Sequence, residues 1–176
     1  GTKGKSSVVE LIAFILEQAG KKVVVSSSVR NTDSGLTMPG RFFLHRLLRQ
    51  GVERGCEYAV IEVTSQGILQ SRHRCIDWNV AVCTNIAPEH IEAHGGFEKY
   101  RDAKVSFFAY AAKNPTAVFI VNTDDTNVNY FVRAAENHTV TMFTASALPS
   151  QLLGEFNQYN IGAAVAVAES LGIASA

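Results

Sequence analysis

The sequence has 176 residues, of which 47% are apolar and 18% are charged, as in a soluble globular domain rather than a disordered chain. Sixteen basic and sixteen acidic side chains cancel, so charge gives no reason to expect nucleic acid or a membrane as partner. No apolar run reaches the roughly 18 residues of a membrane helix. Three cysteines (Cys56, Cys75 and Cys83) lack CxxC spacing. We therefore expect a cytoplasmic monomer with free thiols.

Short β-branched runs alternate with longer segments of helical spacing along the chain. The runs that predict buried strands are 23–26, 58–63, 80–84, 117–121 and 140–143, and the predicted helices are 7–19, 42–54, 97–112, 127–135 and 157–171. Gly20, Gly55 and Gly172 stand where helix-terminating glycines belong. Near-continuous apolar strands indicate an α/β fold, a doubly wound and mostly parallel sheet with helices on both faces.

A glycine-containing loop, GTKGKS at 1–6, directly precedes the first predicted helix. Its backbone N–H groups and the helix N-terminus favour phosphate binding, with Lys5 on the β- and γ-phosphates and the Ser6 hydroxyl on magnesium. The alternative is a plain turn capped by Ser6 or Ser7. Because phosphate loops normally lie between a strand and a helix, we expect the chain to be incomplete at its N-terminus and to lack its first strand.

Ligands of doubly wound sheets lie beyond the carboxyl ends of the strands, and polar side chains follow two predicted strands. Glu62 ends one strand, where a carboxylate is either a magnesium ligand or a solvent-exposed or salt-bridged glutamate. His90 and His94 follow the next strand as a pair of candidate metal ligands, or as an ordinary surface pair. Lys104 lies on or near the inward face of its helix and either reaches solvent or becomes reactive through a lowered pKa.

Six segments, in order, resemble the motifs of the Mur ligases, the ATP-dependent enzymes that add amino acids to the peptidoglycan precursor. They are GTKGKSS at 1–7, EVTSQGILQSR at 62–72, TNIAPEHIEAHG at 84–95, YRDAK at 100–104, NTDD at 122–125 and GEFNQYNIGAA at 154–164. The resemblance implies that residues 1–176 are the central ATP-binding domain, without the N-terminal UDP-binding and C-terminal ligase domains. The short stretch between Phe143 and Gly154 implies that the family's accessory sheet is also absent.

The resemblance also implies a role for each matching residue. The nucleotide-binding residues would be Gly1, Thr2, Gly4, Lys5, Ser6, Ser7, Asn85, Asp125, Asn157 and Asn160. Magnesium would be held by Ser6, Glu62, His90 and a carbamylated Lys104. Lys5, His90 and Lys104 would be catalytic. The muramoyl-peptide substrate would be held by Thr37, Thr64, Gln70 and Arg72, and the planar fork of an arginine suits a carboxylate or phosphate.

The implied reaction uses ATP to activate the carboxylate of a UDP-N-acetylmuramoyl-peptide as an acyl phosphate, which the amino group of an amino acid then attacks. Magnesium and Lys5 would neutralise the negative charges that this step brings together. The alternatives are another Mur-like ligase such as folylpolyglutamate synthetase, a P-loop GTPase or kinase, and a non-catalytic nucleotide-binding fragment. The QSR segment at 70–72 and the TMP segment at 37–39 favour the muramoyl branch.

Overall fold

The computed structural model describes residues 2–31, 35–88, 94–152 and 154–173. All five predicted strands are present, and every pairing between them is parallel, which confirms the predicted α/β class. The strands are β1 (Val23–Ser26), β2 (Tyr58–Ile61), β3 (Val80–Cys83), β4 (Val118–Asn122) and β5 (Thr139–Phe143). In the described part of the chain no strand lies between β5 and residue 154, as expected for a domain without the accessory sheet.

The five predicted helices are confirmed, with ends that move by a few residues. They are α1 (Lys5–Gln18), α2 (Arg41–Glu53), α5 (Phe97–Ala111), α6 (Val128–Ala134) and α7 (Glu155–Ser170). A short helix, α3 (Ser65–Leu69), was not predicted. Its five residues are too few to show a helical period. Its start is set by the Thr64 hydroxyl, which accepts a hydrogen bond from the Gly67 N–H at 3.0 Å.

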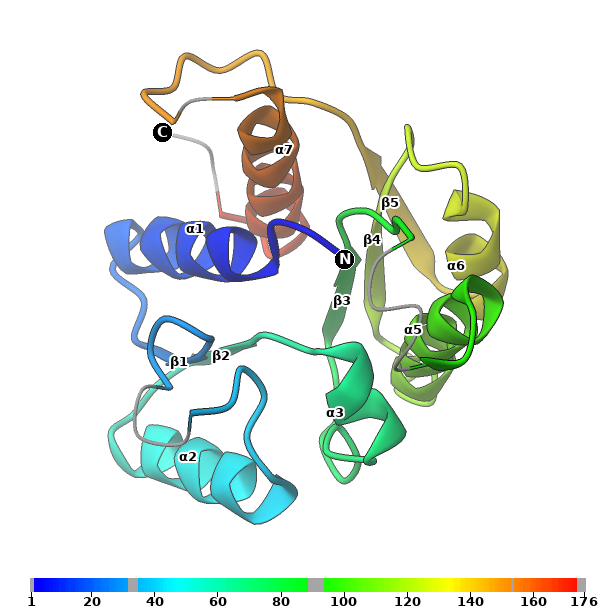
Figure 1. The fold of residues 1–176 in the computed structure, drawn as a ribbon. Helices are drawn as coiled ribbons and strands as arrows, with labels where there is room; N and C mark the ends of the chain where they lie inside the picture. Colours follow the sequence, from blue (N-terminus) through cyan, green and yellow to red (C-terminus); the bar gives the residue numbers. More distant parts are fainter. Residues whose placement is uncertain (1, 32–34, 89–93, 153, 174–176) are drawn as a thin grey trace.

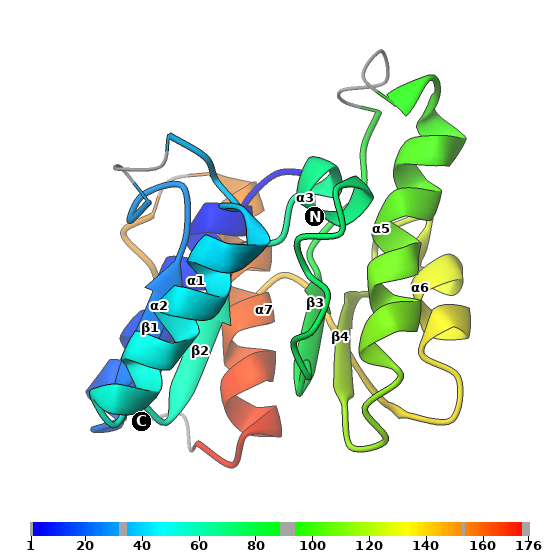
Figure 2. The same cartoon turned by 90° about the horizontal axis from the view of Figure 1, so that it is seen from below.

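Helices cover both faces of the strands, as predicted. α1 and α7 pack on one another and on one face, whereas α5 and α6 pack together on the other face, and α2 packs against β1 (Figure 1). The view from below shows α1 and α7 beside β2 and α5 beyond β3 and β4 (Figure 2). Two apolar cores result, one between the strands and α1 with α7, and one between the strands and α5 with α6.

The five strands form two parallel sheets in the described residues. One sheet has the order β1-β2 and the other β3-β4-β5. A cavity of about 510 Å³ separates β2 from β3 and is lined by residues of both strands. The apolar pattern of the strands predicted their burial and direction, but pairing between particular strands leaves no mark in a strand's own sequence.

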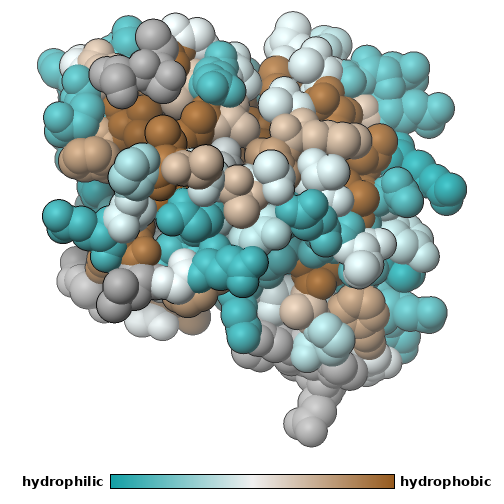
Figure 3. Space-filling model, turned by 90° about the horizontal axis from the view of Figure 1, so that it is seen from above, coloured by the Kyte–Doolittle hydropathy of each residue, from teal (hydrophilic) through white to brown (hydrophobic). Residues whose placement is uncertain are grey.

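The surface mixes apolar and polar side chains. Figure 3 shows one face, on which brown apolar patches lie among teal polar groups. None of the described helices combines the length and the apolar character that crossing a membrane requires.

Candidate functional site

The predicted phosphate loop lies at the N-terminus of α1 and has a conformation that glycine makes possible. Gly4 is the N-cap residue and has φ 77°, in the left-handed region. A Cβ atom at Gly4 would lie 2.1 Å from the Asn160 Oδ1 atom of α7. Because α1 has no side-chain cap and begins before Ser6 and Ser7, the alternative of a turn capped by either serine is wrong.

The loop is bonded to the residues that follow β3. The Asn85 Oδ1 atom accepts hydrogen bonds from the Thr2 and Lys3 N–H groups at 3.0 and 2.9 Å. The Asn85 Nδ2 group donates to the Lys3 carbonyl at 3.0 Å, and the buried Thr2 hydroxyl lies 3.0 Å from the Tyr100 hydroxyl. The Asn85 side chain therefore fixes the loop backbone.

Ser6 and Glu62 meet at the carboxyl end of β2. The Ser6 hydroxyl donates to Glu62 Oε2 at 2.8 Å, and the Ser28 N–H donates to the same oxygen at 3.0 Å. Glu62 is only 3% exposed, which excludes the alternative of a surface glutamate. No lysine or arginine is paired with it among the described ion pairs. A buried carboxylate beside a hydroxyl group is the kind of oxygen pair that magnesium prefers.

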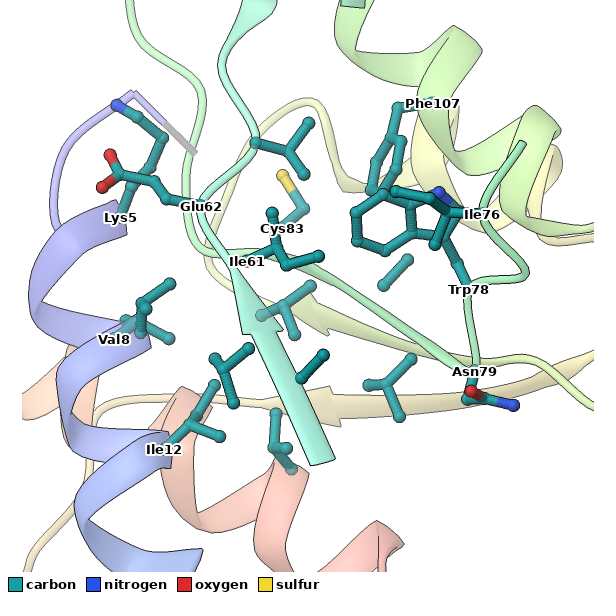
Figure 4. A pocket seen from close by; sticks show the side chains of 18 of the residues that line it. Lys5, Val8, Ile12, Ile61, Glu62, Ile76, Trp78, Asn79, Cys83 and Phe107 are labelled. Atoms are coloured by element: carbon teal, nitrogen blue, oxygen red, sulfur yellow. The ribbon is translucent and has the colours of Figure 1, made fainter. Parts of the chain in front are cut away.

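Two lysines from different elements, α1 and α5, line the same cavity as Glu62. Lys5 Nζ donates to the Thr2 carbonyl at 2.9 Å, and Lys5, Glu62 and Lys104 line the same cavity. Figure 4 shows the Lys5 and Glu62 side chains near one another at one end of it. Lys104 is 6% exposed. Burial lowers the pKa of Lys104 to about 8, although the neighbouring Cys83 opposes this shift; the positive charge of Lys5 reinforces it.

Two of the predicted residues, Gly1 and His90, lie outside the described residues. Within the described ranges no group of three or more His, Cys, Asp and Glu side chains could hold a metal ion. His94 is placed against the ring of Tyr100, and its Nε2 atom lies 3.1 Å from the Ser65 hydroxyl. Among the described residues, a metal ion at the carboxyl end of β2 would therefore be bound by Glu62 and nearby hydroxyl groups. Any further unmodified side-chain ligand would come from outside the described residues.

The residues assigned to the rest of the nucleotide gather around the loop. Asp125 accepts hydrogen bonds from the N–H groups of Ile86 and Asn127. Asn160 is 2% exposed and donates to Asn157 Oδ1 at 3.0 Å. Asn160 thus packs against Gly4, whereas Asn157 lies at the more open end of α7.

The four residues assigned to the muramoyl-peptide lie near one another, and each has at least one polar group bonded within the chain. The Arg72 guanidinium donates to the Met38 carbonyl and to Gln70 Oε1. The Thr37 carbonyl accepts from Asn31 Nδ2 at 3.0 Å, and the Thr64 hydroxyl caps α3. Segment 37–38 is therefore joined to the end of α3 through Arg72.

Sequence reasoning missed Ser28 and the hydroxyl of Tyr100. Ser28 Oγ lies 2.7 Å from Ser6 Oγ, so a second hydroxyl group lies beside the Ser6–Glu62 pair. The signal was available, because three serines at 26–28 run from the last residue of β1 past its carboxyl end. Tyr100 was recognised only as part of the lysine motif, and its bond to Thr2 spans 98 residues.

Comparison with known proteins identifies the family of the chain. The family model for the Mur ligase middle domain matches residues 1–148. The 2,6-diaminopimelate-adding UDP-N-acetylmuramoyl-L-alanyl-D-glutamate ligase of Geobacillus kaustophilus is 30% identical over 98% of the chain and 43% of its own length. The UDP-N-acetylmuramyl-tripeptide synthetase of Treponema denticola is 34% identical over 82% of the chain and 30% of its own length. The chain thus spans less than half the length of these relatives.

Solved structures show the same fold. A UDP-N-acetylmuramoyl-L-alanyl-D-glutamate–2,6-diaminopimelate ligase superposes with a TM-score of 0.86 at 22% identity, over 98% of this chain and 42% of that one. The D-alanyl-D-alanyl-adding ligase of Acinetobacter baumannii superposes with a TM-score of 0.74 at 23% identity, over 99% and 42%. With a family model that covers most of the sequence and a fold shared with such ligases, the chain belongs to the Mur ligase middle domain family.

Proposed function

We propose that the chain is the ATP-binding core of an amide ligase that activates the carboxylate of a UDP-N-acetylmuramoyl-peptide in the cytoplasm. The carboxylate attacks the γ-phosphate of ATP and forms an acyl phosphate, and the amino group of an amino acid then displaces phosphate. The names of the relatives support this reaction, because they describe ligases that join 2,6-diaminopimelate, an amino acid, to UDP-N-acetylmuramoyl-L-alanyl-D-glutamate. Residues 1–176 would be the central domain of such an enzyme, between a UDP-binding and a ligase domain.

The observation that carries the proposal is the contact between Ser6 and Glu62. Its 2.8 Å hydrogen bond joins the phosphate loop to the end of β2, and its two oxygen-bearing groups fit magnesium. When bound, magnesium would neutralise part of the negative charge of the phosphates. Ser28 holds the Glu62 carboxylate through its N–H group and thereby keeps Glu62 turned toward Ser6.

Lys5 supplies a positive charge at the loop. In the structure its ammonium group is held by the Thr2 carbonyl, so it is already folded back over the loop where phosphates would lie. Gly4 and the N-terminus of α1 add N–H groups and the positive end of the helix dipole. Asn85 and Asp125 hold the surrounding backbone, and Asn157 and Asn160 would border the nucleoside.

Lys104 is suited to carbamylation. A neutral amine adds to the carbon of carbon dioxide, a nitrogen–carbon bond forms, one proton leaves, and an anionic carbamate results. With its pKa lowered to about 8 by burial, Lys104 is neutral in a large fraction of molecules near that pH. The carbamate would be a carboxylate-like ligand beside Glu62, with His90 as a further ligand. Thr37, Thr64, Gln70 and Arg72 would hold the substrate after Arg72 exchanges its internal partners for a substrate anion.

Calorimetric titration with ATP and magnesium tests the proposal. Because Glu62→Gln keeps the shape of the side chain but removes its charge, we expect it to weaken magnesium-dependent ATP binding at least tenfold, about 1.4 kcal/mol. The matched control is Glu57→Gln, because Glu57 is an exposed partner of Lys21. Equal affinities for Glu62→Gln and the unsubstituted chain would contradict the proposal. Stronger binding of GTP than ATP would favour a GTPase instead.

A further inference from the structure

The segment that follows β4 carries two adjacent aspartates, which bond to different parts of the fold. Asp125 accepts a hydrogen bond from the Ile86 N–H group, beyond the end of β3. Asp124 accepts two hydrogen bonds on one oxygen, Oδ2, from the Thr144 hydroxyl at 2.7 Å and from the Tyr159 hydroxyl at 2.9 Å. Only Asp125 has a part in the proposed function, so the contacts of Asp124 are unused by it.

The contacts of Asp124 join three elements through an ionised group. The hydrogen bonds from Thr144 and Tyr159 lower the pKa of the Asp124 carboxyl, so this group is an anion at neutral pH. The bond to Asp124 in turn raises the pKa of the Tyr159 hydroxyl, which therefore keeps its proton and remains a donor. Hydrogen bonds to an ionised acceptor are roughly twice as strong as those between neutral groups. Asp124 thus links the chain beyond β4 and β5 to α7.

The backbone of α7 packs directly on the residue that follows β5. A Cβ atom at Gly162 would lie 2.2 Å from the Thr144 carbonyl oxygen. The Ser146 N–H donates to the Gln158 carbonyl at 3.0 Å. Figure 1 shows this part of the chain running from β5 toward α7. The helix is therefore held against the same residue whose hydroxyl group binds Asp124.

Two contacts on different faces of α7 fix its rotation. Asn160 packs against Gly4 of the phosphate loop, and the Tyr159 hydroxyl binds Asp124. Successive residues of a helix lie about 100° apart around its axis, so these neighbours hold separate faces. Because Asn157 accepts from Asn160 Nδ2 at 3.0 Å, the direction of the Asn157 side chain follows from the rotation of the helix.

We propose that Asp124 is a positioning residue for nucleotide binding, which acts through Tyr159 to hold α7 so that Asn157 faces the base of ATP. This inference rests on the proposed function, in which Asn157 borders the nucleoside. The phosphates are not involved, because they would be bound by the loop and magnesium at the other side of Asn160. The effect of Asp124 is therefore confined to the base of the nucleotide, and this separates it from the effect of Glu62.

Calorimetric titration with two ligands tests the inference. One ligand is magnesium–ATP, and the other is magnesium–tripolyphosphate, which has no base. Tyr159→Phe removes only the hydroxyl that binds Asp124. We expect it to weaken ATP binding about three- to tenfold, the effect of one hydrogen bond, and to leave the affinity for tripolyphosphate unchanged. Asp124→Ala should act in the same way, whereas Asp124→Asn, which keeps an acceptor oxygen, should weaken ATP binding less.

A double-mutant cycle shows whether the hydroxyl acts through Asn157. Tyr159→Phe should change ATP affinity by less than about twofold in an Asn157→Ala background, because the side chain that it orients is gone. A purely structural loss would be the same in both backgrounds. The matched control is Tyr130→Phe, because Tyr130 is an exposed tyrosine of α6 whose ring lies under Arg101, and it should leave both affinities unchanged.

Three results would overturn the inference. They are equal losses of affinity for ATP and tripolyphosphate in Tyr159→Phe, unchanged affinity for both ligands, and a loss in the Asn157→Ala background as large as in the unsubstituted chain. Each of them leaves the proposed function standing as long as Glu62→Gln weakens the binding of both ligands. Failure of the unsubstituted chain to bind either ligand would overturn the proposed function, and the positioning role of Asp124 with it.

Discussion

The two ends of the space between β2 and β3 are built in opposite ways. At the carboxyl end, the loop is held by Asn85 from beyond β3, by Asn160 from α7 and by Glu62 from β2. Below it, the cavity is apolar and its strand edges are unpaired in the described ranges. The chemistry-bearing loop thus depends on side-chain contacts at one edge and not on closure of the sheet beneath it. Substitutions at the loop should be costly, whereas substitutions at the exposed, unpaired edge of β2 should be tolerated.

The largest effect is expected from Lys104→Ala in the full-length enzyme. Loss of the carbamate that would lie beside Glu62 should lower the ligation rate at least about 1,000-fold, or roughly 4 kcal/mol. Short carboxylic acids should restore part of the rate by occupying the vacated position. Phosphate release in the presence of both substrates measures this. Lys113→Ala is the control, because the Lys113 ammonium group lies over the ring of Tyr110 near the C-terminal end of α5. Unchanged turnover of Lys104→Ala would exclude the carbamate role.

Gly4→Ala should destabilise the conformation of the phosphate loop and lower the free energy of unfolding. The left-handed backbone alone costs about 1–2 kcal/mol, and the collision of the new Cβ atom with Asn160 adds a similar amount or more. Gly20→Ala isolates the collision, because Gly20 has φ 75° and nothing within 4 Å of its Cβ position. Urea unfolding should show a larger loss of unfolding free energy for Gly4→Ala. Equal losses in the two variants would contradict the close packing of α7 on the loop.

The pH dependence of the free energy of unfolding should reveal the lowered pKa of Lys104. Its pKa is about 8 in the folded chain and 10.5 in the reference state, so between these values the unfolded chain binds more protons and stability rises with pH. The burial cost, about 3 kcal/mol, is complete below pH 8 and disappears toward pH 10.5. Lys104→Met should therefore be more stable than the unsubstituted chain at pH 7, and the difference should shrink by pH 10.5. A difference that is constant with pH would show that Lys104 keeps an ordinary pKa.

The smallest effect is expected at the cavity. Ala59→Val should change the unfolding free energy by less than about 0.5 kcal/mol, because Ala59 is exposed in β2 and valine suits a strand. Thermal unfolding of the 176-residue chain measures this. A loss as large as that of Gly4→Ala would mean that the β2 edge is already packed, and the contrast between the two ends would fail.

Much of the fold follows from local sequence. The five strands and five longer helices are visible as runs of β-branched residues and as helical periods, and the direction of the strands follows from their apolar pattern. The phosphate loop is equally local, because Gly4, Lys5 and Ser6 stand directly before an amphipathic helix. The sequence did not predict α3, because five residues carry no helical period and the start of the helix depends on the single Thr64 cap.

The sequence by itself determined the five strands, the five longer helices, the parallel direction of the strands and the polar residues that follow them, because these depend on neighbours a few residues apart. Only the tertiary structure decided that Glu62 is buried against Ser6 and Ser28, that burial lowers the pKa of Lys104, and that a cavity separates β2 from β3. These features depend on contacts between residues tens of positions apart. Burial and pairing of that kind are set by how whole elements pack, which no local pattern records.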